Sequence, residues 1–338
     1  MVVVNRSWNI QSEVHNSYLQ SFLSCLSTCR NSLLKWSRNV FPNNLKVISE
    51  LKARLAEYNQ EPLTLKMKKN IADIKVEIES AFDREEQYWK QRSRIEWLRA
   101  GDKNSRFFHL STIKRRHQNA ILKLRDDAGN WLSESHDIAA NISIFFQELF
   151  HSDGVREMDV ALNFVDRKID DQMNSQLERP ITKEEIREAV FSLGSTKAPG
   201  PDGFSGKFYQ SAWPEISESV CSMIFEFFAG DSELNVLNET NITLIPKIPK
   251  PEHVSHFRPI GLCNFAYKII SKIMANKMRS LMGFCISQNQ SAFIPGRIIH
   301  DNIIIAHEVY HNLRRKKKSK KYEFALKMDM SKAYDRVE

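Results

Sequence analysis

The sequence has few cysteines and no long apolar run, and these shortages exclude several classes of protein. Its five cysteines are an odd number at irregular spacing. They lack histidine partners at ligand spacing, which argues against a disulfide framework or a zinc site. No apolar stretch approaches the roughly 20 residues that a membrane-spanning helix needs. The apolar start at Met1–Val4 is too short for a signal peptide, so we expect a reduced, intracellular protein without membrane partners.

A second carboxylate pair is also missing, and this matters because of Asp329. Phe324–Asp329 alternates apolar and other residues as a strand does, and it would place Asp329 at the strand end. Nucleotidyl transfer by two metal ions needs at least two carboxylates on one platform. Asp126-Asp127 falls in a sequence typical of a hairpin turn, and Asp170-Asp171 lies in a polar stretch. On this segment alone, Asp329 as a plain helix cap is the simpler interpretation.

The charge is basic and clustered. The 338 residues contain 49 lysines and arginines against 41 acidic residues, which gives a net charge of +8. The densest basic run spans residues 314–321 and a second spans 103–117. Such a balance favours an anionic partner. A chain of this length has room for two or three domains.

The first hundred residues have helical periodicity. One apolar stripe runs from Val47 to Leu55 and another from Ile71 to Phe82. Pro62 separates them, so an antiparallel helical pair is expected, with Gly101 ending the second helix. A structural arm is the simplest interpretation of this region.

Residues 103–119 mix cations with aromatics. The cations that we assign to nucleic acid are Lys103, Arg106, Arg115 and Arg116. Rings among cations suit RNA, whose bases stack on aromatic side chains. Ordinary burial preferences nevertheless favour the hydrophobic core for Phe107 and Phe108.

Several local signals place elements in the second half. Thr182 and Glu185 have capping-box spacing at a helix start. Residues 197–203 form a Pro/Gly loop, which by itself suggests a rigid linker. Trp213-Pro214 opens a helix that ends near Gly230, and Ile242–Ile245 is a short strand ended by Pro246. Asp301 has the position of an N-cap.

An ordered series of sequence blocks lies at residues 97–109, 197–204, 241–247, 257–262, 267–272, 288–297 and 326–335. Each block alone is weakly specific, and the order and spacing together are highly specific. The series resembles the reverse transcriptase of plant LINE-type non-LTR retrotransposons.

The resemblance implies an α+β fold, in which a helical N-terminal arm precedes right-hand polymerase fingers and the first part of a palm. The implied regions are a connector at 1–100, an N-terminal extension at 101–181, and fingers with the first palm strand at 182–338. The implied reaction is RNA-directed DNA synthesis with two Mg²⁺ ions, and the partners are an RNA template, a DNA primer and deoxynucleoside triphosphates. A functional protein of this class would act in the nucleus.

Individual roles also follow from the resemblance. Asp329 would be the catalytic metal ligand, joined by the backbone carbonyl of Met330. The triphosphate would contact Lys247, Arg258 and Ser331, and Tyr334 would reject a ribose 2′-hydroxyl. Template contacts fall on Lys197, Gln290 and Arg297.

One departure from the family limits the expected activity. The sequence reaches Glu338 without the aromatic-Ala-Asp-Asp hairpin that would supply the second carboxylates, so we expect no catalysis from this chain alone. An RNA-binding remnant and a helical interaction protein are the alternatives. The oligomeric state stays open.

Overall fold

The computed structural model describes residues 2–9, 17–41, 43–60, 64–95, 105–152, 154, 162–163, 166–231, 235–315 and 323–328. The chain divides into two compact units, each built from two separate stretches. The first contains Met1–Arg125 and Val190–Tyr267, and the second contains Asp126–Ala189 and Lys268–Glu338. Helices dominate the described residues, with two small two-stranded sheets. This composition confirms the α+β class, while the three regions expected from the resemblance stay a prediction.

The first unit is mainly helical and carries the larger sheet. Its elements are α1 (Val2–Trp8), α2 (Tyr18–Val40), α3 (Asn44–Tyr58), α4 (Leu65–Ser93), α5 (Ser105–Asn119), β1 (Leu124–Arg125), α10 (Gly206–Ser211), α11 (Trp213–Ala229), β3 (Thr240–Pro246), the 3-10 turn η1 (Val254–His256) and β4 (Phe257–Cys263).

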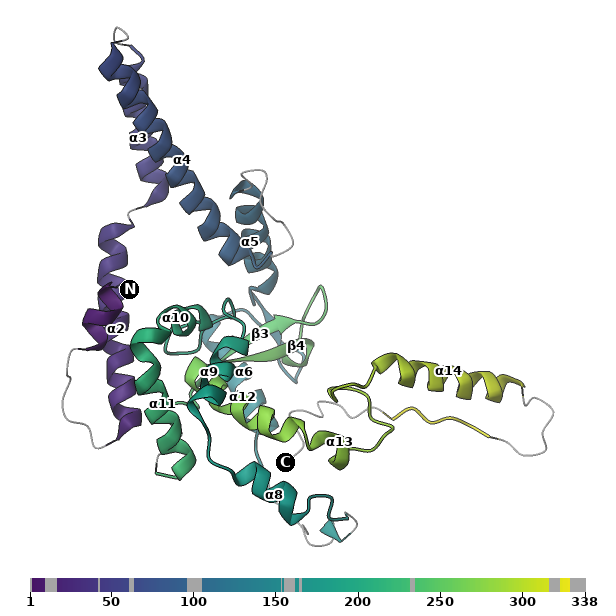
Figure 1. Cartoon of the computed structure of the whole chain (residues 1–338). Coiled ribbons are helices and arrows are strands. Elements are labelled where there is room, and N and C mark those ends of the chain that lie inside the picture. Colours follow the sequence, from purple (N-terminus) through teal and green to yellow (C-terminus); the bar gives the residue numbers. More distant parts are fainter. Residues whose placement is uncertain are drawn as a thin grey trace. The chain divides into compact units, whose positions relative to one another are not determined.

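The predicted helical pair is confirmed. Helices α3 and α4 lie side by side and run in opposite directions in Figure 1. Ile48 and Leu51 on α3, and Ile74 and Ala81 on α4, are buried as the two stripes predicted. Thr64 caps α4 by accepting a hydrogen bond from the Met67 N–H at 3.3 Å.

Helix α4 ends earlier than its sequence suggested. The expectation that Gly101 would end it is wrong, because the helix stops at Ser93 and Arg94 takes the left-handed conformation with φ 58°. The Arg115 guanidinium, on α5, donates to the Ser93 carbonyl at 2.8 Å and to the Arg92 carbonyl. These bonds satisfy carbonyls that a helix end leaves open, so a tertiary contact replaces the glycine cap.

A cluster of aromatic and aliphatic side chains holds α1, α2 and α11 together. Trp8 is 5% exposed, and its ring lies 5.9 Å from that of Phe22. Its indole N–H donates to the Ser219 hydroxyl at 3.1 Å. Cys29 is buried nearby, and burial raises the pKa of its thiol. All five cysteines are free thiols, and Cys221 is buried as well.

Helix α11 has the boundaries that its sequence predicted. Pro214 lies in the first turn, where its missing N–H costs no helical hydrogen bond. Gly230 follows the helix at φ 84°, a left-handed position that favours glycine. Local chemistry alone therefore determined both ends.

The elements of the second unit are β2 (Trp131–Leu132), α6 (Ser135–Leu149), α8 (Asp171–Glu178), α13 (Met282–Cys285) and α14 (Ile299–Arg315). Helices α9 (Lys183–Ser192) and α12 (Phe265–Arg279) extend across the boundary between the units.

Both acidic pairs have structural roles. The Asp126 carboxylate accepts from the Asn130 N–H at 2.7 Å, and this bond lowers the pKa of Asp126. Asp170 caps α8 by accepting from the Met173 N–H at 2.7 Å. Turn and cap formation therefore explain one member of each pair, and the turn at Asp126 agrees with the sequence-based prediction.

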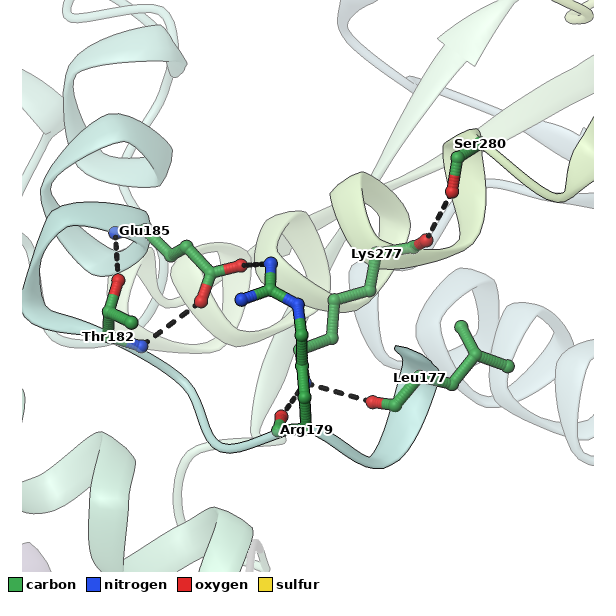
Figure 2. A network of polar contacts seen from close by, with 6 residues as sticks. All are labelled: Leu177, Arg179, Thr182, Glu185, Lys277 and Ser280. Atoms are coloured by element: carbon green, nitrogen blue, oxygen red, sulfur yellow. Dashed lines mark hydrogen bonds and ion pairs between the residues drawn. The ribbon is translucent and has the colours of Figure 1, made fainter. Parts of the chain in front are cut away.

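A polar network ties the connection before α9 to α12 within the second unit (Figure 2). The predicted capping box is confirmed: the Glu185 N–H donates to the Thr182 hydroxyl at 3.2 Å, and the Thr182 N–H donates to the Glu185 carboxylate at 3.1 Å. That carboxylate also pairs with Arg179 at 2.6 Å. The Lys277 ammonium donates to the carbonyls of Leu177 (2.9 Å) and Arg179. Burial lowers the pKa of Lys277.

Two expectations near the C-terminal end are corrected. Residues 323–328 form no strand, and Phe324, Leu326 and Met328 are all largely exposed. A strand requires hydrogen-bonded pairing with a neighbour, and this segment pairs with no strand in the described part of the chain. Asp301 is the third residue of α14, rather than its N-cap.

Across the residues that the structure describes, no helix combines the length and apolarity of a membrane span.

Candidate nucleic-acid interface

Strand pairing places Lys247 and Arg258 on one face of the β3–β4 hairpin. The antiparallel register pairs Ile245 with Arg258 and Pro246 with Phe257. The Lys247 N–H then donates to the His256 carbonyl at 2.8 Å, which continues the ladder. Because side chains alternate between faces, Lys247 and Arg258 point to the same side as diagonal neighbours, a relation with a typical separation of about 7–8 Å.

This face is open to solvent, and the opposite face is packed at Phe257. Lys247 and Arg258 are both exposed, and Ile245 beside them is 41% exposed. Phe257, which points to the other side, is only 3% exposed. The buried face fixes the orientation of the hairpin, and the two cations remain accessible to a ligand.

The loop between the two strands has a defined conformation. The His256 Nδ1 atom accepts from the Glu252 N–H at 3.1 Å and from the His253 N–H at 3.3 Å. The Lys247 ammonium donates to the Ser255 carbonyl at 3.1 Å. The Arg125 N–H donates to the Glu252 carbonyl at 2.7 Å, and their side chains form an ion pair at 3.5 Å. These bonds restrict where the Lys247 side chain can reach.

Helix α5 contacts β3, so the basic-aromatic segment lies beside the hairpin within the first unit. Arg106 and Arg116 are exposed on this helix. Phe108 is 1% exposed, as expected of a core residue, whereas Phe107 is 40% exposed. The core prediction is therefore right for Phe108 and wrong for Phe107, because helical neighbours point in different directions.

Neighbouring arginines on α5 differ in their contacts. Arg115 is partly buried and donates to the α4 carbonyls described above, whereas Arg116 is exposed. The sequence could not separate a side chain that caps a helix from one that is open to a ligand.

The Pro/Gly loop is held by a buried asparagine that sequence reasoning missed. Asn264 is 6% exposed, accepts from the Asp202 N–H at 3.0 Å and donates to the Leu237 carbonyl at 3.3 Å. An asparagine just before a helix suggests a cap, and no sequence signal indicated a contact with residue 202. Lys197 is exposed at the start of this loop.

In the second unit, Gln290 and Arg297 belong to one loop. The Arg297 guanidinium donates to the carbonyls of Gln290 at 2.6 Å and Ile286 at 3.2 Å. Gln290 is exposed. Arg297 therefore has a structural function in this loop, whatever else it binds.

The predicted metal and sugar contacts lie outside the described residues. These are Asp329, Met330, Ser331 and Tyr334, and Lys103 is also outside. Among the residues that are described, no group of three or more histidines, cysteines or carboxylates could hold a metal ion. The described part thus contains several of the cations predicted to contact nucleotide or template, and it contains no candidate metal centre.

Comparison with known proteins agrees with this chemistry. The reverse transcriptase (RNA-dependent DNA polymerase) family matches residues 248–338. A 149 kDa protein of transposon TX1 from Xenopus laevis is 29% identical over 250 residues, 73% of this chain and 19% of its own length. A Pol polyprotein of the type-1 retrotransposable element R2 from Nasonia vitripennis is 27% identical over 47% of this chain and 14% of its own length.

A further relative is a probable RNA-directed DNA polymerase from transposon BS of Drosophila melanogaster. It is 27% identical over 47% of this chain and 18% of its own length. The chain thus spans a fifth or less of the curated relatives that it matches. Residues 248–338 match the reverse transcriptase family, and the chain is similar to proteins of non-LTR retrotransposons.

Proposed function

We propose that this chain is part of an RNA-directed DNA polymerase, which in the intact protein extends a DNA 3′ end on an RNA template. The observation that carries the proposal is the shared solvent face of Lys247 and Arg258. Arg258 lies within the matched region, and Lys247 immediately precedes it. The order of the sequence blocks supports a plant-type LINE and a nuclear site of action.

Two cations on one face suit the triphosphate of an incoming nucleotide. Phosphoryl transfer relies on positive groups that neutralise the charge on phosphate oxygens. Arginine can hold phosphate with two parallel hydrogen bonds, and lysine acts as a point charge. We assign the β3–β4 hairpin to the polymerase fingers on this basis.

The RNA template would contact the other exposed cations. Arg106 and Arg116 lie on α5, which contacts β3, and Lys197 begins the loop held by Asn264. Such contacts to phosphate position a nucleic acid without reading its sequence. The resemblance adds Gln290 as a further candidate for template contact.

The metal ions would be held by the Asp329 carboxylate and the Met330 carbonyl, both of them oxygen ligands of the kind that Mg²⁺ prefers. When bound, the metal supplies charge stabilisation for nucleotidyl transfer. The Ser331 N–H would donate to the triphosphate, and the Tyr334 ring would exclude a 2′-hydroxyl.

Asp329→Ala distinguishes a polymerase site from an RNA-binding remnant. We expect the wild-type chain to bind an RNA·DNA primer–template more tightly when Mg²⁺ and dTTP are added together. Loss of an oxygen ligand to the metal should reduce that gain on the order of tenfold, without changing RNA affinity in the absence of metal. Fluorescence anisotropy with labelled primer measures both quantities.

Asp335→Ala is the control, since it makes the same substitution six residues after Asp329. We expect it to behave as wild type. If RNA binding depends on salt, yet Mg²⁺ and Asp329→Ala change nothing, the chain is a non-catalytic RNA-binding protein. If the wild-type chain binds no RNA at all, the proposal fails.

The two neighbouring arginines of α5 should give opposite results. Arg115→Ala removes the bonds to the end of α4, so we expect a loss of about 1–2 kcal/mol in the free energy of unfolding. Arg116→Ala should leave stability unchanged and reduce the slope of log K for RNA against log salt by about 1. Thermal melts and anisotropy titrations at several salt concentrations test both. Equal effects of the two variants would contradict the assignment.

A further inference from the structure

Phe293 is an outlier in both backbone and exposure. It lies in the loop between α13 and α14, its φ is 65°, and its side chain is fully exposed at 102%. A bulky residue is rarely left-handed, and an exposed ring forfeits the free energy of burial. Strained residues of this kind persist where the surrounding structure imposes them, and they gather at functional sites.

The residues on both sides of Phe293 are anchored. Ser291 is 6% exposed, and its hydroxyl donates to the Asn302 side-chain oxygen on α14 at 2.9 Å. Ile294 is 7% exposed, and its carbonyl accepts from the Arg297 N–H at 3.2 Å. The ring is therefore held away from the protein by a fixed backbone on either side.

The Arg297 guanidinium secures the incoming half of the same loop. It donates to the carbonyls of Ile286, Ser287 and Gln290. Because one side chain gathers three carbonyls, the turn before Phe293 keeps its shape in the absence of any ligand. The backbone around Phe293 is therefore ordered before a ligand binds, which lowers the entropic cost of forming an aromatic contact.

Two kinds of partner could cover an exposed ring: an unstacked nucleobase or an apolar protein surface. The neighbouring side chains favour the nucleobase, since Gln288, Asn289 and Gln290 are all exposed amides. Amides can bond the edges of a base whose face stacks on a ring. The net charge of +8 also favours a polyanion.

We propose that Phe293 stacks on a base of single-stranded RNA. This rests on the proposed function, in which the chain binds an RNA template, and it adds a contact to the bases, beside the phosphate contacts given above. Stacking on an aromatic side chain tolerates any base, which suits an enzyme that copies templates of varied sequence.

The test is binding of a labelled single-stranded RNA oligonucleotide to the full chain, with affinity measured at several salt concentrations. Phe293→Ala should weaken binding about 5- to 150-fold, the range found for loss of one stacked base. The salt slope should stay unchanged, because no phosphate contact is lost. Phe293→Trp should bind RNA about as tightly as wild type, because it keeps an aromatic ring at this position. The control is Phe284→Ala, which removes a ring that is 64% exposed on α13. Its RNA affinity should stay within about twofold of wild type, because Phe284 is not proposed to stack on a base.

Each other outcome identifies a different failure. If wild type and Phe293→Ala bind RNA equally, stacking is wrong and the proposed function stands. If Phe293→Ala leaves RNA affinity unchanged but abolishes self-association seen by sedimentation, the ring covers a protein surface and the proposal is overturned. If wild type binds no RNA, the proposed function itself fails, and the stacking proposal fails with it. A melting temperature equal to wild type verifies that the variant is folded.

Discussion

Replacing Gly200 with alanine should destabilise the first unit by about 3 kcal/mol, near the upper end of the cost of overpacking. An added Cβ would lie 2.5 Å from the Asn264 nitrogen and 2.5 Å from the Cys263 carbonyl carbon. Both are backbone atoms at the end of β4, so they cannot swing aside as a flexible side chain does. The Cβ would also lie 2.7 Å from the Asn264 oxygen that accepts from Asp202.

The consequence extends beyond the glycine. Gly200 opens the turn that Gly203 closes, since the Gly203 N–H donates to the Gly200 carbonyl at 3.1 Å. Moving the turn away from β4 would break the Asn264–Asp202 bond and expose the Asp202 and Gly203 amides to solvent. We therefore expect faster hydrogen exchange at residues 200–204, together with a lower midpoint of urea unfolding.

Gly283→Ala is the matched control. A Cβ at Gly283 meets nothing within 4 Å, and the residue lies in α13, where alanine is favoured over glycine by about 1 kcal/mol. We expect no loss of stability from this variant. A Gly200→Ala protein as stable as wild type would show that the loop does not pack on β4 as described.

The second large effect concerns nucleotide binding. We expect the double variant Lys247→Ala/Arg258→Ala to bind a fluorescent deoxynucleoside triphosphate about 100-fold more weakly than wild type. Each hydrogen bond to a charged group contributes about 1.5–3 kcal/mol. Because this face is open to solvent, we expect the contributions of Lys247 and Arg258 to lie near the lower end of that range. Each single variant should then lose about tenfold, and a double-mutant cycle would reveal any coupling between these diagonal neighbours.

Two further variants sharpen this prediction. Lys250→Ala removes an exposed lysine from the loop that follows β3. We expect it to leave nucleotide affinity unchanged, because the β3–β4 pairing does not put Lys250 beside Arg258. Arg258→Lys keeps the charge but loses the two-pronged geometry, so we expect an intermediate affinity. Equal losses from Lys250→Ala and Lys247→Ala would show that only net charge matters, which would contradict the assignment of a specific face.

The sequence predicted best those features that depend on interactions between neighbouring residues. The capping box at Thr182, the entry and exit of α11, and the apolar stripes of α3 and α4 all follow from interactions within a few residues. The family resemblance likewise depends on short ordered blocks, and the match over residues 248–338 agrees with it. The sequence named Lys247 and Arg258, yet it could not show that they share a face.

Tertiary contacts decided the remainder. The register of β3 against β4 placed Lys247 beside Arg258, because pairing depends on how residues 240 and 263 meet. Arg115 ended α4 from another helix, where the sequence had suggested a glycine. Residues 323–328 have strand periodicity but no paired neighbour among the described residues, and so they form no strand.

By itself, the sequence determined the chemical character of this protein: its basic charge, the ends of α11 and the blocks that resemble reverse transcriptase, all of which are local properties of the chain. The tertiary structure decided which cations are accessible, which are used as caps, and that Asn264 holds the Pro/Gly loop. The physical reason is that exposure and pairing depend on contacts between residues far apart in sequence, such as Asn264 with Asp202.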